Sequence, residues 1–587
     1  MDAGYSYASF VFVGIRYCLA RPHKLTIARL QRCETTDMPL AKSSLPTSSP
    51  TRRATIGVDV GTGSARAGVF DATGRLIASA KHAITTWHSP GNIVEQSSDQ
   101  IWQAVCISVR DAVAQSGLAA KDIIGIGFDA TCSLVAVTAE GAPVAVGPTG
   151  DPQRNIIVWM DHRATIEAAE INAGNHAVLA YVGGKISPEM QTPKLLWLKK
   201  NLAQSLTDAG HFFDLSDYLT WRSTGSASRS ICTVTCKWTY LAHENRWDSA
   251  YFNAIGLEAL VADGFARIGK DIVAPGTALG DGLTANAAAE LGLLPGTAVG
   301  AALIDAHAGG VGTLGVSIAD APADETRRLA YIFGTSACAM ASSTAPVFVK
   351  GVWGPYYAAM LPGLWLTEGG QSAAGAAIDH LIAMHPAAAK AGEFATAAGM
   401  SVVNWLEKRA AEHSPVPTDV VDLAKSVHVV PEFLGNRSPH ADPDARAVIA
   451  GLSLDTGIDD LVGLYIAGLC GVGYGLRQLL NSLRADGIQI DTIIVSGGAA
   501  QSDLVRQLLA DATAIPVAAA TTPEPVLLGA AMLAANAAGL FPSLQQAMVH
   551  MSGTAVVFHP MQGRTAALHT ARFQAFEALQ TVARQIR

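Results

Sequence analysis

The chain has 587 residues, of which 49% are hydrophobic and 15% are charged, and it carries a net charge of −8. The length excludes a single ordinary domain, and the composition is typical of a well-buried α/β enzyme. The acidic balance, without any cluster of Lys and Arg, argues against a nucleic-acid partner. No run reaches the roughly 18 apolar residues that cross a membrane.

The first 53 residues differ from the rest of the sequence. An apolar stretch at 10–15 precedes the basic residues instead of following them, which is the reverse of a secretory signal. Frequent arginines fit a mitochondrial-type presequence, but we favour a working protein that begins near Met38. We therefore expect residues 1–53 to be a disordered extension. The eight scattered cysteines form no zinc-binding pattern and suit a reduced, cytoplasmic protein.

The first segment that carries chemistry is IGVDVGTGSARAGVF at residues 56–70. It predicts a buried strand, a glycine-rich turn over 61–64 and a second strand that starts near Arg66. Glycines let the backbone turn sharply and expose its N–H groups, and two hydroxyls lie beside them, as in a phosphate-binding loop. Asp59 stands at the strand end, where a carboxylate can reach a metal–phosphate complex. An ordinary β-hairpin fits these residues equally well.

Strands and helices then alternate up to about residue 316. Apolar spacing predicts a helix over 101–114 and strands over 123–128, 134–137, 155–159 and 299–304. Polar groups follow two of these strands, namely Thr131 and the run Asp161, His162 and Arg163. An acid, an imidazole and a guanidinium together suit hydrogen bonds to several sugar hydroxyls, although a surface salt-bridge cluster fits them too.

Asp305 follows the strand at 299–304, so its carboxylate should face a cleft at the carboxyl end of that strand. A carboxylate beside a sugar hydroxyl can accept its proton during attack on phosphorus. A helix N-cap suits the position equally well. The next residues, 310–315, match G-x-G-x-x-G, but they lack a clear βαβ unit, so we expect no dinucleotide site there.

A second strand–turn–strand unit occupies residues 331–341 and has Gly334, Thr335 and Ser336 at its turn. The repeat favours phosphate binding over a plain hairpin, because a nucleotide between two such halves would touch both turns. This arrangement resembles the superfamily of actin, hexokinase and heat-shock chaperone ATPases. The chain contains no G-x-x-x-x-G-K-[ST], which disfavours a P-loop NTPase.

The second half repeats the alternation after a Pro/Ala/Asp-rich joint at 318–325. We expect strands over 329–333, 364–367 and 493–496, and helices over 373–384, 459–485 and 502–512. Residues 368–375 are expected to form a small-residue loop that enters a helix and favours an anionic phosphate. Residues 495–502 repeat this pattern of a strand, a small-residue loop and a helix. Their loop contains two adjacent glycines, so adenine or ribose can lie close to the backbone there.

Five longer strings carry a narrower resemblance. They are VWMDHRA at 158–164, SPEMQTPKLLW at 187–197, FVKGVWGPY at 348–356, EGGQS at 368–372 and GNRSP at 435–439. On these strings the chain resembles the FGGY family of carbohydrate kinases over about residues 55–580, and within it the D-ribulokinase branch of pentulose kinases. The resemblance implies an α/β protein with a two-domain actin-like, ribonuclease H-like ATPase fold. A duplicated sheet-and-helix core would have its domains at 54–317 and 326–587, with an interdomain cleft.

The resemblance also implies roles for individual residues. Asp305 matches the catalytic base, and Asp59 matches an aspartate associated with magnesium. The nucleotide positions are Gly61, Thr62, Gly63, Ser64 and Arg66 in the first phosphate loop, Gly334, Thr335 and Ser336 in the second, Gly375 and Asp379 near the phosphates, and Gly498 and Ser502 near adenosine. Ser502 replaces an Asn that is frequent in related kinases. The sugar positions are Thr131, Asp161, His162, Arg163 and Asp305.

We therefore expect ATP- and Mg²⁺-dependent phosphorylation of the terminal hydroxyl of a ketopentose, with D-ribulose as the substrate. Another sugar or polyol kinase is the alternative within the enzyme class, acting on L-ribulose, ribitol, xylulose or an erythritol-like compound. An actin-like ATP-binding module that drives partner binding is the alternative from a different class. Family resemblance further implies a homodimer.

Overall fold

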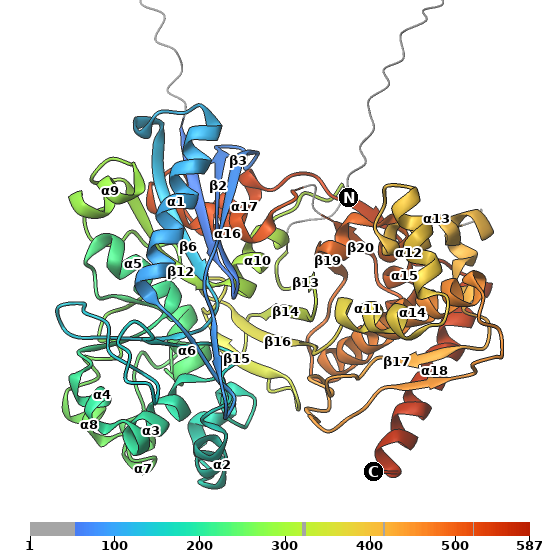
Figure 1. Cartoon of the computed structure of the whole chain (residues 1–587), viewed down its shortest axis with the longest axis horizontal. Coiled ribbons are helices and arrows are strands. Elements are labelled where there is room, and N and C mark those ends of the chain that lie inside the picture. The colour runs from blue at the N-terminus through green and yellow to red at the C-terminus, as the bar shows by residue number, and fades with distance from the viewer. Residues whose placement is uncertain (1–52, 320–323, 415–416, 520–521) are drawn as a thin grey trace, which may run out of the picture. The chain divides into compact units, whose positions relative to one another are not determined.

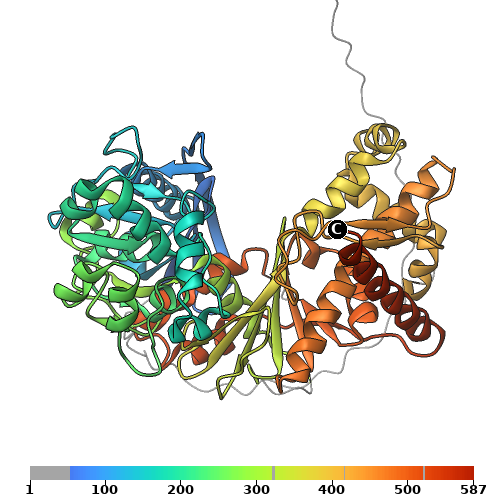
Figure 2. The ribbon, with the colours of Figure 1, turned by 90° about the horizontal axis from the view of Figure 1, so that it is seen from below.

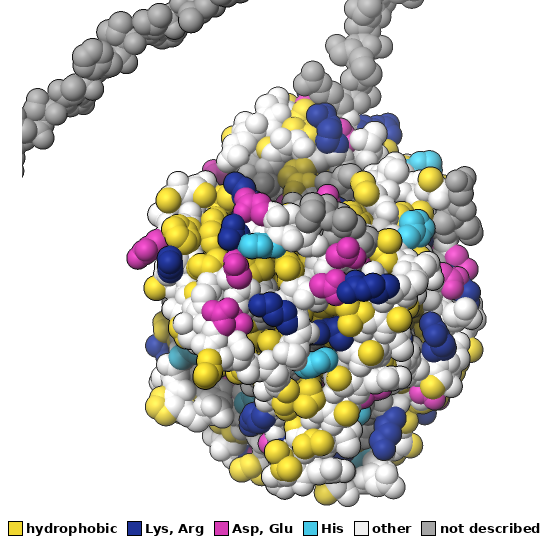
Figure 3. Space-filling model, turned by 90° about the vertical axis from the view of Figure 1, so that its right-hand side faces the viewer, with side chains coloured by type: hydrophobic (Ala, Val, Ile, Leu, Met, Phe, Trp, Pro, Cys, Tyr) yellow, Lys and Arg dark blue, Asp and Glu magenta, His cyan; other side chains and the backbone are white. Residues whose placement is uncertain are grey.

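The computed structural model describes residues 53–319, 324–414, 417–519 and 522–587. The predicted extension at 1–53 therefore lies outside the described residues except for Arg53, as do residues 320–323 of the predicted joint. Among the described helices, none is both long and apolar enough to cross a membrane. On the face drawn in Figure 3, acidic and basic side chains are interspersed among apolar ones.

The first half is built on a five-stranded sheet in the order β12-β6-β1-β2-β3. Its strands are β1 (Ala54–Val60), β2 (Ser64–Asp71), β3 (Leu76–Ala83), β6 (Ile123–Ala130) and β12 (Ala298–Ile304). β1 runs antiparallel to β2 and parallel to β6, which in turn runs parallel to β12. Asp59 pairs in register with Asp129, and Asp305 directly follows β12. Three carboxylates therefore lie together at the carboxyl ends of the parallel strands.

Helices cover both faces of this sheet (Figure 1). Ile56 and Val58 of β1 pack into one core with α1 (Ser98–Ser116). On the other face, α16 (Pro525–Ala537) packs against β6, β1 and β12, although it comes from the far end of the sequence. The predicted boundary at 317–326 therefore separates the two main sheets but not all of the helices that cover them.

The glycine-rich motif at 310–315 belongs to a helix. α10 (Asp305–Leu314) contains most of it and packs closely on α16. A Cβ added at Gly312 would lie 1.9 Å from the carbonyl oxygen of Pro525, so the two helix backbones approach too closely for a side chain. These glycines serve helix packing, which agrees with the expectation that the motif is not a dinucleotide site.

A smaller five-stranded sheet and several short helices complete the first half. The sheet has the order β4-β5-β8-β7-β9, with β4 (Trp87–Ser89), β5 (Ile93–Gln96), β7 (Leu134–Val137), β8 (Ile156–Ile157) and β9 (His211–Asp214). A two-stranded pair joins β10 (Arg229–Ser230) and β11 (Ile272–Val273). The helices are α2 (Thr165–Ala173), α3 (Gln191–Asn201), α4 (Ala203–Asp208), α5 (Leu215–Thr224), α6 (Ile231–Trp238), α7 (Ser249–Ala254), α8 (Glu258–Ala262) and α9 (Ala285–Leu291), with 3₁₀ turns η1 (Ala120–Asp122) and η2 (Ala177–Val182).

The second half is built on a seven-stranded sheet in the order β15-β16-β14-β13-β19-β20-β21. Its strands are β13 (Arg328–Phe333), β14 (Ala337–Ser343), β15 (Trp353–Tyr357), β16 (Trp365–Gln371), β19 (Thr492–Gly497), β20 (Val517–Ala519) and β21 (Val556–Phe558). β13 is antiparallel to β14 and parallel to β19, which repeats the relation of β1 to β2 and β6. The predicted α/β architecture with a duplicated core is therefore confirmed.

Helices surround this second sheet as well. They are α11 (Gly375–Met384), α12 (Ala388–Ala397), α13 (Val402–His413), α14 (Ile458–Ala485), α15 (Asp503–Thr513) and α18 (Arg564–Gln585), with 3₁₀ turns η3 (Pro417–Ala424) and η4 (Gly498–Gln501) and the hairpin of β17 (His428–Val430) and β18 (Val448–Ala450). α17 (Leu544–Met551) instead packs against α16 and α10, beside the first sheet. α18, the dark red helix at the end of the chain in Figure 2, packs against α15 and β17.

One predicted element is wrong in kind. Residues 368–371 were expected in a loop, but they form the end of β16, where Gly369 pairs with Ala339 and Gly370 with Cys338 of β14. Two adjacent glycines hide a strand from sequence patterning, since they add neither β-branched side chains nor alternation. The consequence is that Glu368 projects from a strand.

Candidate active site

A cavity of about 340 Å³ lies where the strands of both main sheets end. Its lining comes from β1, β2, β12, α6 and α10 of the first half and from β13, β14, β15 and β16 of the second. Acidic and basic groups meet in it, namely Asp59, Glu189, Asp305 and Glu368 with Arg66, Lys237, His307 and Arg437. Such convergence of polar groups on one cavity is typical of a site for a small polar ligand.

The structure brings some of the predicted site residues to this cavity. Asp59, Gly61, Arg66, Thr131, Asp305 and Ser336 line it. Thr62, Gly63 and Ser64 continue the turn that begins at Gly61, and Gly334 and Thr335 precede Ser336. The remaining predicted residues, which are Asp161, His162, Arg163, Gly375, Asp379, Gly498 and Ser502, do not line it.

The first predicted phosphate loop is a tight turn that hydrogen bonds from residues outside the loop hold in place. The Gly61 N–H donates to the Ser64 carbonyl at 3.1 Å, and the Thr62 carbonyl accepts from Gln96 Nε2 at 2.8 Å. Trp159 donates its indole N–H to Thr62 Oγ1 at 3.0 Å. Within the described residues, the N–H groups of Thr62 and Gly63 have no acceptor, so they are available to an anion.

The second predicted loop is built in the same way. The Gly334 N–H donates to the Ser336 carbonyl at 2.9 Å, and the N–H groups of Thr335 and Ser336 lack an acceptor in the described part of the chain. The start of α11 holds this turn, because the Gly375 N–H donates to the Gly334 carbonyl at 3.0 Å. A Cβ at Gly375 would lie 2.8 Å from that carbonyl oxygen, which explains the glycine. Gly375 therefore supports the loop in this structure.

Asp59 and Arg66 form an ion pair at the mouth of the first loop. Arg66 donates to Asp59 Oδ2 through two nitrogens and to Glu524 Oε2 at 2.7 Å. Arg66 thus presents a guanidinium to the cavity from a fixed position. A guanidinium so placed suits the oxygen atoms of a phosphate group.

The residues present fit a magnesium ion held together with nucleotide phosphates. Mg²⁺ in such sites binds one or two carboxylates and completes its shell with water and phosphate oxygens. Asp59 lines the cavity, and neither carboxylate oxygen of its buried neighbour Asp129 has a hydrogen-bond partner among the described residues. Burial, with Asp59 and Asp305 close by, raises the pKa of Asp129 well above its usual value. In the described chain, no cluster of three or more His, Cys, Asp or Glu forms a complete metal site.

Asp305 begins α10 at the floor of the cavity. Its Oδ1 accepts from the Ala306 N–H at 2.7 Å, which fixes the carboxylate at the start of the helix. Burial, with the Asp59 charge nearby, raises the pKa of Asp305 to about 6. A carboxylate with a pKa just below neutral is suited to accept a proton at physiological pH.

Five charged residues that line the cavity were not predicted as site residues, namely Glu189, Lys237, His307, Glu368 and Arg437. Lys237 lies in α6 with its ammonium 5.3 Å from the ring centre of Trp353. Glu189 and Glu368 fall within the SPEMQTPKLLW and EGGQS strings, so the signal was present, but it was not assigned to a role. Lys237 belongs to no such string, and only the fold brings it to the cavity.

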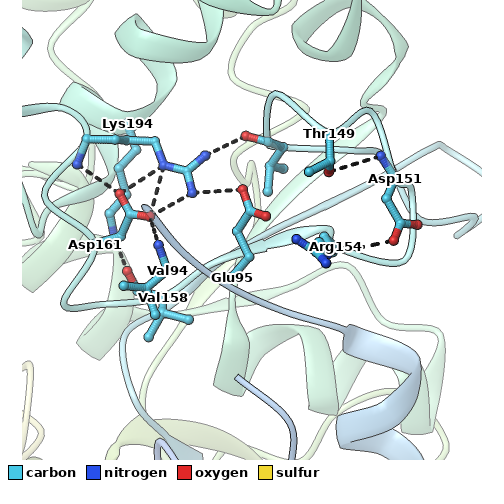
Figure 4. A network of polar contacts seen from close by, with 10 residues as sticks. Val94, Glu95, Thr149, Asp151, Arg154, Val158, Asp161 and Lys194 are labelled. Atoms are coloured by element: carbon cyan, nitrogen blue, oxygen red, sulfur yellow. Dashed lines mark hydrogen bonds and ion pairs between the residues drawn. The ribbon is translucent and has the colours of Figure 1, made fainter. Parts of the chain in front are cut away.

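Asp161 and Arg163 form a buried ion-pair network with Glu95, and Figure 4 labels Asp161 and Glu95 within it. Arg163 Nη2 donates to Asp161 Oδ2 at 2.6 Å and to Glu95 Oε1 at 3.0 Å, while Arg163 Nη1 donates to the Val146 carbonyl. Both partners of the Asp161–Arg163 pair have side chains that are at most 1% exposed. Their hydrogen-bonding groups are engaged within the protein, so direct sugar contacts are not supported for them.

His162 is closer to the cavity than its two neighbours. Its Nε2 lies 3.3 Å from Glu189 Oε1, and Glu189 lines the cavity. This hydrogen bond raises the pKa of His162 above its usual value. His162 therefore orients a lining residue and does not line the cavity itself.

Asp379, predicted near the phosphates, and Gly498 and Ser502, predicted near adenosine, do not line the cavity. Asp379 and Gly498 are exposed. Ser502 caps α15, since its Oγ accepts from the Val505 N–H at 3.2 Å. Their roles stay predictions.

Two turns with free N–H groups and a carboxylate, all at the wall of one cavity, are the parts of a kinase for a small hydroxylated substrate. Comparison with known proteins narrows this class. The N-terminal domain of the FGGY family of carbohydrate kinases matches residues 54–312, and the C-terminal domain of the same family matches residues 329–538. The chain therefore belongs to the FGGY family of carbohydrate kinases, and it has the two-domain actin-like fold.

Individual relatives agree with this family. An FGGY carbohydrate kinase domain-containing protein of Homo sapiens is 46% identical, over 86% of this chain and 92% of that protein. A D-ribulokinase of Saccharomyces cerevisiae is 39% identical, over 84% of this chain and 73% of that protein. The crystal structure of a xylulose kinase from Rhodospirillum rubrum superposes with a TM-score of 0.73 at 22% identity, covering 91% of this chain and 99% of that one.

Proposed function

We propose that this protein transfers the γ-phosphoryl group of ATP to the terminal hydroxyl of D-ribulose and forms D-ribulose 5-phosphate. The position of Asp305, on the cavity floor with one N–H-bearing turn on each side, carries this proposal. The 39% identity to a D-ribulokinase supports the choice of sugar. We further propose that the protein is cytoplasmic. Its dimeric state is a prediction from the family resemblance.

Asp305 acts as the general base in the proposed reaction. Its carboxylate accepts the proton of the attacking hydroxyl as the new O–P bond forms and the bond to ADP breaks. General-base help is worth roughly 10²–10⁴-fold in rate. With a pKa of about 6, Asp305 is largely ionised at neutral pH and is ready to accept this proton.

The two turns hold the phosphates on either side of the transferred group. N–H groups of Thr62 and Gly63 in one turn and of Thr335 and Ser336 in the other have no acceptor in the described protein, so they can donate to phosphoryl oxygens. Arg66 adds a fixed positive charge from the first side. Mg²⁺, held near Asp59 together with the nucleotide, would neutralise charge on the phosphates.

The sugar would bind along the polar wall beyond Asp305. An open-chain ketopentose presents a carbonyl and several hydroxyls, and each hydroxyl both donates and accepts hydrogen bonds. Lys237 supplies a donor there, while Glu189 and Glu368 supply acceptors. Carboxylates reject a substrate that lacks the matching hydroxyl, because their hydrogen bonds are then unmade.

A substrate panel tests the proposal. ADP release should be followed with D-ribulose, L-ribulose, D-xylulose, ribitol, erythritol and glycerol, in the presence of ATP and Mg²⁺. We expect the highest kcat/KM with D-ribulose and sugar-dependent ADP release that is about 10²–10⁴-fold slower in the Asp305→Asn variant. A higher kcat/KM for another sugar would replace the proposed substrate, and ADP release that no sugar stimulates would overturn the kinase proposal.

A further inference from the structure

Three side chains from different parts of the chain form a row that leads from the cavity wall into the protein interior. Cys232 Sγ in α6 lies 3.0 Å from His307 Nδ1 in α10. His307 Nε2 lies 3.2 Å from Glu368 Oε2 in β16. Cys232 is fully buried and does not line the cavity, whereas His307, which is 1% exposed, and Glu368, with 12% of its side chain exposed, both line it. The row therefore joins one half of the chain to the other.

The sulfur of Cys232 is surrounded by donors. Besides His307, the Ile304 N–H approaches it at 3.4 Å, and the thiol of Cys236, one helical turn further along α6, hydrogen-bonds to it. A buried cysteine that only fills space needs no such partners. A backbone N–H donor together with an imidazole at hydrogen-bond distance can stabilise a thiolate at this sulfur.

His307 uses both of its ring nitrogens in this row. Nδ1 faces the sulfur and Nε2 faces the Glu368 carboxylate, so a ring protonated at both nitrogens satisfies both neighbours. Burial alone would favour the neutral ring, but the charges of Cys232 and Glu368 outweigh it and raise the pKa of His307 to about 10. The same contacts lower the pKa of Cys232 and of Glu368, despite burial.

We propose that Cys232 is a positioning residue of the sugar site, whose thiolate holds His307 as an imidazolium that in turn fixes the Glu368 carboxylate toward the bound sugar. The proposal rests on the proposed function, in which this cavity binds the sugar. The sulfur itself does not touch the substrate, since Cys232 does not line the cavity. Its effect reaches the sugar through the orientation and charge of Glu368.

Loss of the thiolate should weaken sugar binding more than ATP binding. In Cys232→Ser the hydroxyl keeps a polar atom beside His307 but does not ionise, so the ring loses the charge that favours its protonation. A hydrogen bond that involves charged groups is worth about 1.5–3 kcal/mol, which corresponds to a rise in sugar KM of roughly ten- to hundredfold. Because Glu368 belongs to the sugar wall, the KM for ATP should change less than about twofold.

Two measurements on the full-length enzyme test the proposal. The first compares KM for D-ribulose and for ATP in the wild type and in Cys232→Ser, with Cys470→Ser as the matched control, because Cys470 is equally buried but lies in α14. The second is the far-ultraviolet difference spectrum of the wild type minus each variant at neutral pH, since a thiolate absorbs there and a thiol or hydroxyl does not. His307→Gln provides an independent way to remove the imidazolium if Cys232→Ser folds poorly.

The expected result is one thiolate absorbance band that is lost in Cys232→Ser and in His307→Gln and kept in Cys470→Ser, together with the selective rise in sugar KM. An unchanged spectrum in Cys232→Ser, or equal rises in the KM values for sugar and ATP, would overturn the proposal. The spectrum requires no turnover. If the wild type phosphorylates no pentulose, the proposed function fails while the thiolate row is still tested separately.

Discussion

Trp159 donates its indole N–H to Thr62 Oγ1 at 3.0 Å, so a residue that lines the cavity also fixes the first phosphate loop. Trp159→Phe keeps an aromatic ring and removes only this donor. One neutral hydrogen bond contributes about 0.5–1.5 kcal/mol, so we expect the KM for ATP to rise about two- to tenfold. Steady-state kinetics at saturating sugar measure this KM.

Trp405→Phe, in α13 and away from the cavity, is the control and should leave the KM for ATP unchanged. An unaltered KM for ATP in Trp159→Phe would contradict the assignment of residues 61–64.

The pH dependence of the reaction should report Asp305. Burial next to Asp59 raises the pKa of Asp305 to about 6, and the base must be ionised to accept a proton. A raised pKa means that the active, ionised form is lost early as the pH falls. We therefore expect kcat/KM for the sugar to be constant above neutrality and to fall about tenfold per pH unit below about pH 6.

Asp305→Asn should lower kcat and should also remove the fall of kcat/KM below about pH 6. We expect kcat to fall by about 10²–10⁴-fold, because the amide cannot accept the proton. Binding of MgATP, measured by calorimetry, should stay within about twofold of the wild type, since the loops are intact. A variant with wild-type kcat would show that another group is the base.

Lys237 should contribute to sugar affinity. Lys237→Met keeps the length of the side chain and removes the ammonium from the cavity wall. We expect the KM for the sugar to rise about tenfold or more while the KM for ATP is nearly constant, since a charged donor contributes about 1.5–3 kcal/mol. The exposed Lys185 provides the control substitution to Met. If only the KM for ATP rose in Lys237→Met, the ammonium would belong to the nucleotide side.

Arg163 should matter for stability. Arg163→Met leaves the buried carboxylates of Asp161 and Glu95 without their cation. Breaking a buried ion pair from one side costs about 3–5 kcal/mol, so the free energy of unfolding in urea should fall by about that much. Arg409→Met, which breaks an exposed pair with Glu412, should cost no more than about 1 kcal/mol. A stable Arg163→Met variant with a raised sugar KM would restore the predicted sugar contact.

The packing role of the glycine motif can be tested by two Gly→Ala substitutions in helices. In Gly312→Ala the new methyl group meets the Pro525 carbonyl, so α10 and α16 must move apart, and we expect a loss of about 1–3 kcal/mol in unfolding free energy. In Gly392→Ala, within α12, no atom lies within 4 Å of the new methyl group. That variant should gain up to about 1 kcal/mol from helix propensity. Equal effects of both substitutions would refute the close helix contact.

Much of the framework was predictable from sequence, because local patterns determine it. The strand–turn–strand units at Gly61 and Gly334 combine apolar runs with glycine turns, and both form as expected. Asp305 was identified because it directly follows an apolar strand. The position of α16 on the first sheet was not predicted, because a helix pattern says which face is apolar but not which sheet covers it.

The cavity wall was harder to predict than the loops. Lys237 lies on a short helix in the middle of the first half, and Glu368 follows no turn signal, since it lies within β16. Both reach the cavity only through packing between segments far apart in sequence. Asp161 and Arg163 show the opposite case. Their residue types suited a sugar, but their close spacing also suited an internal ion pair, and the structure has the ion pair.

In the proposed reaction, Asp305 and the two turns transfer phosphate to the terminal hydroxyl of D-ribulose. The most direct test is to incubate the protein with MgATP and D-ribulose and to identify the product by phosphorus NMR and mass spectrometry. We expect one equivalent of ribulose 5-phosphate for each ADP, and formation of this product about 10²–10⁴-fold more slowly by Asp305→Asn. Phosphate at a different hydroxyl, or ADP formed without any sugar phosphate, would contradict it.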